Sequence, residues 1–400
     1  MKECSGKKVL IVKVSQNDPL SLRVRQSPKY FVLFVFLDHL KLMMLILSHY
    51  TDHNQNQAKR SKYSEGICPQ RFKNSGVKKL IIIGTSPETK EGYHNCKTMM
   101  EEAGIEGVEQ SSSGTSADIK MQLILLGRPG GAGSTYNCPV GNGKKPWTGK
   151  NKCELITLGF IRRENERFEA DGRPMANAKN YTNSTERSLL AGRDEDLLID
   201  LLFLPGLHMS TGITGKLSEE IEASFDDKVV GRNFMDKFLK EINVKRSEYH
   251  GMFSFEGNQA RKLLKKIDKL MDYAKRLPRK HKSRVKQIIE VMKAFDLVVE
   301  SCFCVHLQGD YVKAIKDFSD KYRALDITVP PKVHLVEDHV VQFIERRHPG
   351  LGLGAYTEQS FEAAHHDFKV EWERTKVPLD HSEHGPRYLD TVVRYVNVCL

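Results

Sequence analysis

The sequence predicts an α/β fold that carries a large, mainly α-helical part. Alternating strand and helix patterns begin at Val77, and helical patterns dominate after residue 185. The composition, 40% hydrophobic and 28% charged residues, is that of a soluble globular protein. With 400 residues, the chain has room for two domains or one large one.

The α/β part follows from four consecutive segments. Val77–Ile83 is a short apolar run that predicts a buried strand, and His94–Glu102 predicts a helix. Ser111–Ser116 is expected to be a polar turn. Ala117–Leu126 then predicts an apolar helix that starts at Asp118. Strand, helix, turn and helix in this order are typical of an α/β layer.

The rest of the chain is expected to be helical, with a break at Pro330–Pro331. The apolar periodicity gives candidate helices at Asp194–Phe203, Ile213–Phe225, Gly231–Ile242, Ala260–Arg276, Lys282–Cys304, Asp310–Tyr322 and Val333–Arg346.

These patterns suggest four parts of the chain. Residues 1–76 match the remainder poorly, 77–150 form the α/β part, 151–330 are mainly helical, and 331–400 add C-terminal helices. Within the first part, Phe31–Leu47 has nearly the length of a membrane span but contains Asp38, His39 and Lys41. Polar groups at the centre of a spanning helix are costly, so a membrane partner is not expected. A buried helix, or sequence that is not native to the fold, is favoured.

The cysteines predict neither a zinc module nor a disulfide framework. Eight are scattered along the chain without a CxxC pair, and this is too few to staple a chain of this length. A reducing intracellular compartment fits this usage best. His334 and His339 lie in apolar stretches, where a histidine is more often part of the core than a ligand.

Positive charge is concentrated in one segment. The formal net charge is +11, and Arg261–Lys286 contains twelve Lys or Arg residues against two Asp, a net charge of +10. Such a local excess predicts a polyanionic partner, most simply a nucleic acid backbone, and the alternative is a solvated lysine-rich helix pair. The basic residues are Arg261, Lys262, Lys265, Lys266, Lys269, Lys275, Arg276, Arg279, Lys280, Lys282, Arg284 and Lys286.

An acidic helix is predicted at Tyr356–Trp372. Glu358 and Glu362 stand one turn apart on it, and its apolar positions have helical spacing. Carboxylates fixed on a packed helix can bind a divalent ion for phosphodiester chemistry. A solvated helix face is the alternative.

Several motifs in order resemble transposon-encoded proteins of animal genomes. They are ADIKMQLILLG at Ala117–Gly127, YNCP at Tyr136–Pro139, LPGLHMSTG at Leu204–Gly212 and YHGMFSFEGNQARKLL at Tyr249–Leu264. They are followed by KVHLVEDHVVQFI at Lys332–Ile344 and by LGAYTEQSFEAAHHDFKVEW near the C-terminus. The chain resembles DDE transposases, which have an RNase H-like core with a mixed sheet, interrupted by a helical insertion.

The resemblance implies a DNA strand cleavage and transfer enzyme that uses Mg²⁺ or Mn²⁺ held by two Asp and one Glu. Asp118 matches the second Asp, and Glu362 or Glu358 matches the Glu; Asp118 and Glu362 would then be metal ligands. At Asp118 the alternative is a charge that favours a helix N-terminus. The resemblance further implies that the partner is DNA and that the protein is located in the nucleus. A homo-oligomer is compatible with this class of protein.

Two positions depart from the family pattern. The first Asp would precede the strand predicted at Val9–Val14, where Lys2–Gly6 reads KECSG. The family also tends to have a second Cys where this chain has Gly141. The expected function is therefore a transposase-derived DNA-binding protein, from a degraded or truncated copy, with an inherited rather than an active catalytic site. The alternative is a non-catalytic helical protein that interacts with proteins or nucleic acid.

Overall fold

The computed structural model describes residues 92–103, 112–129, 134–147, 153–249 and 252–356, and the backbone of strands between residues 11 and 87. The chain divides into two compact units. Among the described residues, the first unit contains the large sheet and the helices up to residue 201. The second contains residues 146–147 and 204–356.

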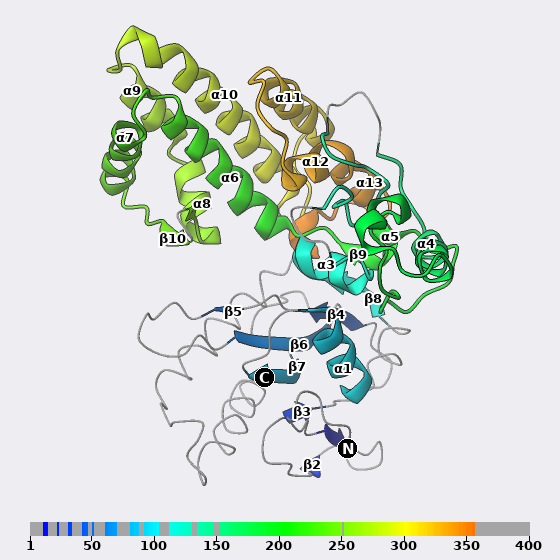
Figure 1. The fold of residues 1–400 in the computed structure, drawn as a ribbon. Coiled ribbons are helices and arrows are strands. Elements are labelled where there is room, and N and C mark those ends of the chain that lie inside the picture. The colour runs from blue at the N-terminus through cyan, green and yellow to red at the C-terminus, as the bar shows by residue number, and fades with distance from the viewer. Residues whose placement is uncertain are drawn as a thin grey trace. The chain divides into compact units, whose positions relative to one another are not determined.

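The first unit is built on a mixed sheet. Its strands follow the order β2-β1-β3-β7-β6-β4-β8-β9, and β5 pairs with β6 (Figure 1). The parallel pairs are β1–β3, β4–β8 and β8–β9. The strands are β1 Ile11–Val14, β2 Leu22–Arg23, β3 Phe31–Leu33, β4 Leu42–Ile46, β5 Tyr50–Thr51, β6 Ser61–Pro69, β7 Ile81–Pro87, β8 Ser112–Ser116 and β9 Leu202–Phe203.

Helices accompany this sheet in the first unit. They are α1 Tyr93–Ala103, α3 Ile119–Leu125, α4 Leu158–Ala170, the 3₁₀ helix η3 Met175–Tyr181 and α5 Leu198–Leu201. Thr157 accepts a hydrogen bond from the backbone N–H of Phe160 at the start of α4, a normal N-cap. The apolar face of α4 is buried through Leu158, Ile161 and Phe168.

The second unit is almost entirely helical, with one two-stranded ribbon. The long helix α10 packs against α6, α9 and α11 (Figure 1). Its core contains Phe295 and Phe318, whose rings lie 5.1 Å apart. The elements are α6 Gly206–Ala223, α7 Lys228–Glu241, β10 Ser247–Tyr249, β11 Met252–Ser254, α8 Gly257–Leu264, α9 Ile267–Ala274, α10 Arg279–Cys302, α11 Tyr311–Arg323, α12 Pro331–Asp338, α13 Val340–Glu345 and the 3₁₀ helix η4 Leu353–Ala355.

The predicted fold class is confirmed at the coarse level, a helix-rich α/β protein. The predicted helix at His94–Glu102 is α1. The helix predicted to start at Asp118 is α3, with Asp118 as its N-cap. The early strand predicted at Val9–Val14 overlaps β1. The helix predicted over Tyr356–Trp372, and with it Glu358 and Glu362, lies outside the described residues.

Several predicted elements are wrong in type or continuity. Ser111–Ser116 was expected to be a turn, but Ser112–Ser116 is strand β8, since pairing with β4 and β9 outweighs its polar composition. Asp194–Phe203 was expected to be one helix but contains only the short α5 before β9. The helix predicted at Ala260–Arg276 breaks into α8 and α9.

Within the apolar N-terminal segment Phe31–Leu47, the part that the structure describes is strand and not the buried helix that its composition favours. Its backbone contains β3 and β4, joined into the sheet by pairing with β1, β7, β6 and β8. A short apolar run fits either a strand or a helix, and only pairing with neighbours decides. Across the described part of the chain, no helix combines the length and the apolar character that a membrane span needs.

Candidate metal centre and basic surface

Asp118 is placed at the carboxyl end of β8 by the turn into α3. Its Oδ1 accepts a hydrogen bond of 2.7 Å from the backbone N–H of Met121, which makes it the N-cap of the helix. The side chain is partly exposed. One carboxylate oxygen is thus used for the cap, and Oδ2 is the atom that could bind a metal. The cap alone accounts for an Asp here.

Buried Gln122 fixes the position of this turn. Its Nε2 donates to the carbonyl oxygens of Ala117, at 2.9 Å, and Phe203, at 2.6 Å. The first turn of α3 is therefore joined to the end of β9, beside which β8 runs in parallel. Asp118 lies at the carboxyl ends of a parallel strand pair, a common position for functional side chains.

A buried thiol pair lies in the first unit, where the sequence predicted no metal module. Cys138 is fully buried and Cys153 is 5% exposed; their Sγ atoms lie within 4.8 Å of each other. Burial would raise the pKa of Cys138. The Cys153 thiol, backbone N–H groups and the charge of Arg128 outweigh that effect, so the pKa lies below its usual value.

A short antiparallel contact brings the two thiols together. Gly141 and Leu155 form an isolated bridge, and the N–H of Asn142 donates to the carbonyl of Glu154 at 2.9 Å. In addition, the N–H of Gly143 donates to Sγ of Cys153 at 3.0 Å. Two cysteines that are well separated in the sequence thus become neighbours.

Buried Arg128 supports the loop that carries Cys138. Its guanidinium donates to three carbonyl oxygens, those of Thr182 at 2.9 Å, Cys138 at 2.9 Å and Tyr136 at 3.1 Å. Burial lowers its pKa to about 10, so it stays charged at neutral pH. Among the described residues no carboxylate pairs with it, and the nearby thiols are the groups whose anionic form it favours.

Gly127 allows Arg128 to reach this position. It has a φ of +73°, and a Cβ here would lie 1.9 Å from the carbonyl oxygen of Glu186. The N–H of Glu186 also donates to the carbonyl of Gly127. A side chain at this position would clash with backbone, so the glycine is required by close approach as well as by φ.

The second unit contains a buried histidine pair. His334 lies on α12, and His339 stands at the break between α12 and α13; both are fully buried. Their ring centroids are 5.1 Å apart, and one nitrogen of each lies within 4.8 Å of the other. The ring of His334 also stacks on Trp147, with centroids 4.5 Å apart.

Both histidines have a polar partner at Nδ1. Nδ1 of His334 lies 3.0 Å from Oδ2 of Asp338, and Nδ1 of His339 lies 2.9 Å from Oε1 of Gln342. The contact at His334 lacks hydrogen-bond geometry. At His339 the amide oxygen favours the tautomer that carries its proton on Nδ1, with the lone pair on Nε2. Metal-binding histidines commonly show this arrangement.

The predicted basic segment spans α8, α9 and the start of α10, and part of it is already engaged. Ion pairs or hydrogen bonds to carbonyls hold five of its side chains. The pairs are Lys265 with Glu300, Lys275 with Asp272, Lys280 with Asp226, Lys262 with the carbonyl of Asn243, and Arg284 with the carbonyl of Leu325.

The remaining basic side chains include a set without such partners. Arg276 lies over the ring of Tyr273, and the charge of Arg261 acts on Asp296. Within the described part of the chain, no ion pair or hydrogen bond engages the side chains of Lys266, Lys269, Arg279, Lys282 and Lys286. This unpaired set is exposed or half-buried and is the part of the segment best able to meet phosphate groups.

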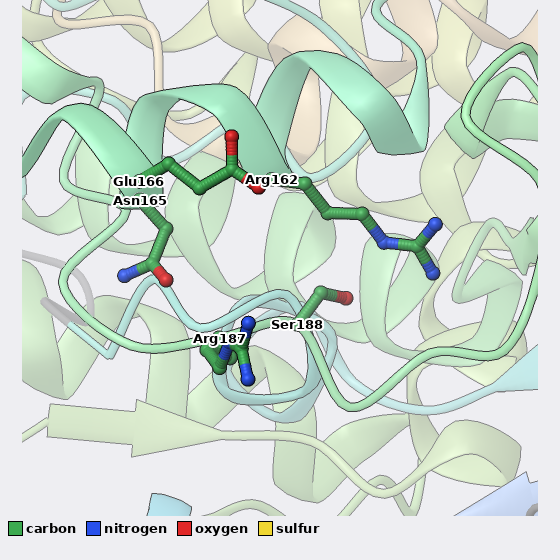
Figure 2. A pocket seen from close by; sticks show the side chains of 5 residues that line it. All are labelled: Arg162, Asn165, Glu166, Arg187 and Ser188. Carbon is green, nitrogen blue, oxygen red and sulfur yellow. The ribbon is translucent and has the colours of Figure 1, made fainter. Parts of the chain in front are cut away.

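A polar pocket of about 250 Å³ lies in the first unit, lined by Arg162, Asn165, Glu166, Arg187 and Ser188 (Figure 2). Arg162 is paired with Asp194 at 2.6 Å. The lining combines two guanidinium groups with a carboxylate, which favours no single class of ligand. None of the residues predicted to be functional lines it.

Compared with known proteins, the chain matches no family model and no curated sequence. The transposase resemblance therefore depends on the motifs themselves. The spacing of the cysteines in the sequence does not indicate the thiol pair, because Cys138 and Cys153 are far apart for a metal-binding motif and only the pairing of their segments brings them together.

Proposed function

We propose that the protein is a transposase-derived DNA-binding protein that holds the DNA backbone with the basic helices of its second unit. The observation that carries this proposal is the unpaired set on the consecutive helices α9 and α10 and at the N-cap of α9: Lys266, Lys269, Arg279, Lys282 and Lys286. Cations without acidic partners can exchange their counterions for phosphates, which is the main source of sequence-independent affinity.

The test is the binding of a mixed-sequence DNA duplex, measured by fluorescence anisotropy between 50 and 200 mM salt. The double variant Lys282→Gln and Lys286→Gln should bind more weakly and reduce the salt slope by about one for each phosphate contact removed. The matched control is Lys313→Gln with Lys321→Gln, exposed on α11, which removes the same charge elsewhere. Its affinity should stay near that of the parent protein.

Two results would contradict DNA binding through this surface. One is an affinity that does not depend on salt, since phosphate contacts release counterions. The other is an equal loss of affinity in the test and control variants, which would indicate a general effect of net charge.

We propose further that the first unit descends from an RNase H-like core with Asp118 as one carboxylate of a metal site. Its position at the end of β8, beside the parallel strand β9, supports this ancestry. Glu362, or Glu358, would supply a second carboxylate, and Mg²⁺ or Mn²⁺ would activate a water or hydroxyl group when bound. With no Asp at Lys2–Gly6, the expected outcome is DNA binding without cleavage.

A nicking assay with Mg²⁺ or Mn²⁺ tests this second part. The parent chain should leave a supercoiled plasmid intact. If the plasmid is cut, Asp118→Asn and Glu362→Gln should each abolish cutting, because Asn retains the helix cap and removes only the charge. Cutting that survives both substitutions would disprove the site assignment while leaving DNA binding untouched.

A further inference from the structure

We infer that His281 makes the DNA affinity of the basic segment depend on pH. When the ring of His281 is protonated it binds Asp226, and Lys280 is released to meet a phosphate group. This inference rests on the proposed DNA binding and describes its regulation. The three side chains all belong to the second unit.

Asp226 engages Lys280 in the structure. Its carboxylate lies in the connection between α6 and α7, and Oδ2 accepts a hydrogen bond from Nζ of Lys280 in the first turn of α10. The hydrogen bond outweighs burial and keeps the pKa of Asp226 below its ordinary value, so the carboxylate stays ionised at neutral and mildly acidic pH. A lysine engaged in this way is less able to exchange its counterion for a phosphate.

Two contacts fix the ring of His281 beside this ion pair. Nδ1 lies 3.0 Å from the carbonyl oxygen of Ser224, and the ring stacks on Phe225 with centroids 4.9 Å apart. A carbonyl oxygen only accepts hydrogen bonds, so the neutral ring carries its proton on Nδ1 and its lone pair on Nε2. The nitrogen that takes up a second proton is therefore Nε2.

That nitrogen faces Asp226. Nε2 of His281 lies 3.8 Å from Oδ2 of Asp226, the same oxygen that accepts the hydrogen bond from Lys280. In the neutral ring a lone pair faces the carboxylate, and the contact is not attractive. A proton on Nε2 makes it an attraction between opposite charges, which a small movement of the carboxylate turns into a hydrogen bond. Asp226 then has two cationic partners, and its bond to Lys280 weakens.

The charges around the ring act in opposite directions. The connection between α6 and α7 contributes Asp226 and Asp227, which favour the protonated ring. The N-terminal turn of α10 disfavours it, through the helix dipole and through the cations Arg279, Lys280 and Lys282. Among the described residues, no charged group of α7 or α9 forms an ion pair with the ring. Histidine changes charge between pH 5 and 8, so this is the interval to test.

Protonation changes the charge that this end of α10 presents to DNA. With a neutral ring, Asp226 cancels the charge of Lys280. With a protonated ring, the carboxylate is neutralised by His281, and Lys280, whose side chain is 69% exposed, can reach a phosphate. One additional contact should strengthen binding roughly threefold to tenfold at 0.1 M salt and raise the salt slope by about one.

The first experiment needs no DNA and observes the ring directly. Histidine labelled with ¹⁵N in the ring is incorporated into the full chain, and the nitrogen signals of His281 are assigned by their loss in His281→Asn. At pH 8 we expect a proton on Nδ1 and a lone pair on Nε2, and at pH 5.5 a proton on both. Asp226→Asn should move this change to lower pH, because the nearby anion is lost. A neutral ring with its proton on Nε2, or no protonation down to pH 5, would overturn the inference.

The second experiment measures the affinity for a mixed-sequence DNA duplex at pH 8 and pH 6, at constant salt, by fluorescence anisotropy. The parent should bind roughly threefold to tenfold more tightly at pH 6. His281→Asn, in which the amide can still donate to the carbonyl of Ser224, should lose this gain, and so should Lys280→Gln. His306→Asn is the matched control, because His306 is exposed beyond the end of α10, and it should respond to pH as the parent does.

Asp226→Asn should have the opposite effect at pH 8. Without the carboxylate, Lys280 is released at both pH values, so this variant should bind at pH 8 about as tightly as the parent binds at pH 6. An equal gain on acidification in His281→Asn and in the parent would overturn the inference and leave DNA binding in place. Absence of DNA binding at both pH values would contradict the proposed function, whereas the nitrogen spectra test the contact between His281 and Asp226 separately.

Discussion

The two units are stabilised in different ways. In the first, buried polar side chains such as Arg128, Gln122 and Asn165 hold loops and strand ends through bonds to backbone carbonyls. In the second, α10 packs its apolar side chains against its neighbours, with Ile288, Phe295 and Val298 fully buried. Among the described residues, both units have a buried apolar core. The hydrogen bonds of Arg128 and Gln122 add to it in the first unit, and we expect their loss to change the free energy of unfolding more than the loss of one methylene beside α10.

The largest effect is expected from Arg128→Met in the first unit. The apolar replacement leaves three buried carbonyl groups without their donor, at a cost of about 3–5 kcal/mol. Chemical denaturation measures this loss. Arg163→Met, an exposed change on α4, is the control and should stay within about 0.5 kcal/mol. Similar stabilities for the two variants would show that the guanidinium bonds contribute little.

A smaller loss is expected from Gln122→Leu. Two carbonyls at the junction of α3 and β9 lose their shared donor, which should cost about 1–3 kcal/mol. Gln287→Leu, exposed on α10, is the matched control and should be nearly neutral. If Gln122→Leu leaves the free energy of unfolding unchanged, the expected difference between the two units is wrong.

Substitutions at Asp118 can separate the stabilising effect of its helix cap from that of its negative charge. Asp118→Ala should destabilise the protein by about 1 kcal/mol because the N–H of Met121 loses its acceptor. Asp118→Asn keeps a hydrogen-bond acceptor at the cap and should lower the free energy of unfolding by only a few tenths of a kcal/mol. Thermal unfolding measures both. Equal losses for Ala and Asn would mean that charge, and not the cap, stabilises this turn.

In the second unit, Ile288→Val should cost only about 0.5–1.5 kcal/mol, although Ile288 is fully buried. Removing one methylene leaves a small cavity that neighbouring side chains fill in part. Chemical denaturation compares this variant directly with Gln122→Leu. If Ile288→Val loses more stability than Arg128→Met, the comparison of the two units is reversed.

The last prediction is a change of stability at alkaline pH. Tyr93 donates its hydroxyl to the carbonyl of Arg187 at 2.8 Å, and burial raises its pKa to about 12. A raised pKa means that the neutral form stabilises the fold fully below pH 10, the ordinary pKa of tyrosine, and that this contribution is lost as pH rises towards 12. Tyr93→Phe removes the hydrogen bond to Arg187 and should be less stable than the parent near neutral pH by about 0.5–1.5 kcal/mol. The difference in unfolding temperature should narrow as the pH rises towards 12, because the variant has no hydroxyl to ionise.

The sequence accounted for much of the local structure. Helices α1, α7, α10 and α11 and the start of α3 at Asp118 followed from periodicity and caps, which are properties of short segments. Strands β8 and β9 did not follow, because a serine-rich strand and a two-residue strand are formed only by pairing with neighbours. For the same reason, the breaks at Lys266 and His339 are not visible in the apolar pattern.

The sequence by itself determined the concentration of charge in Arg261–Lys286 and the kinds of side chain available for a site. Tertiary structure decided which of those side chains are used. Ion pairs engage Lys265, Lys275 and Lys280 and leave other cations without partners. Chain folding likewise brings Cys138 to Cys153 and orients His334 and His339 through Nδ1. Contacts between side chains depend on distance in space, which spacing in the sequence does not reveal.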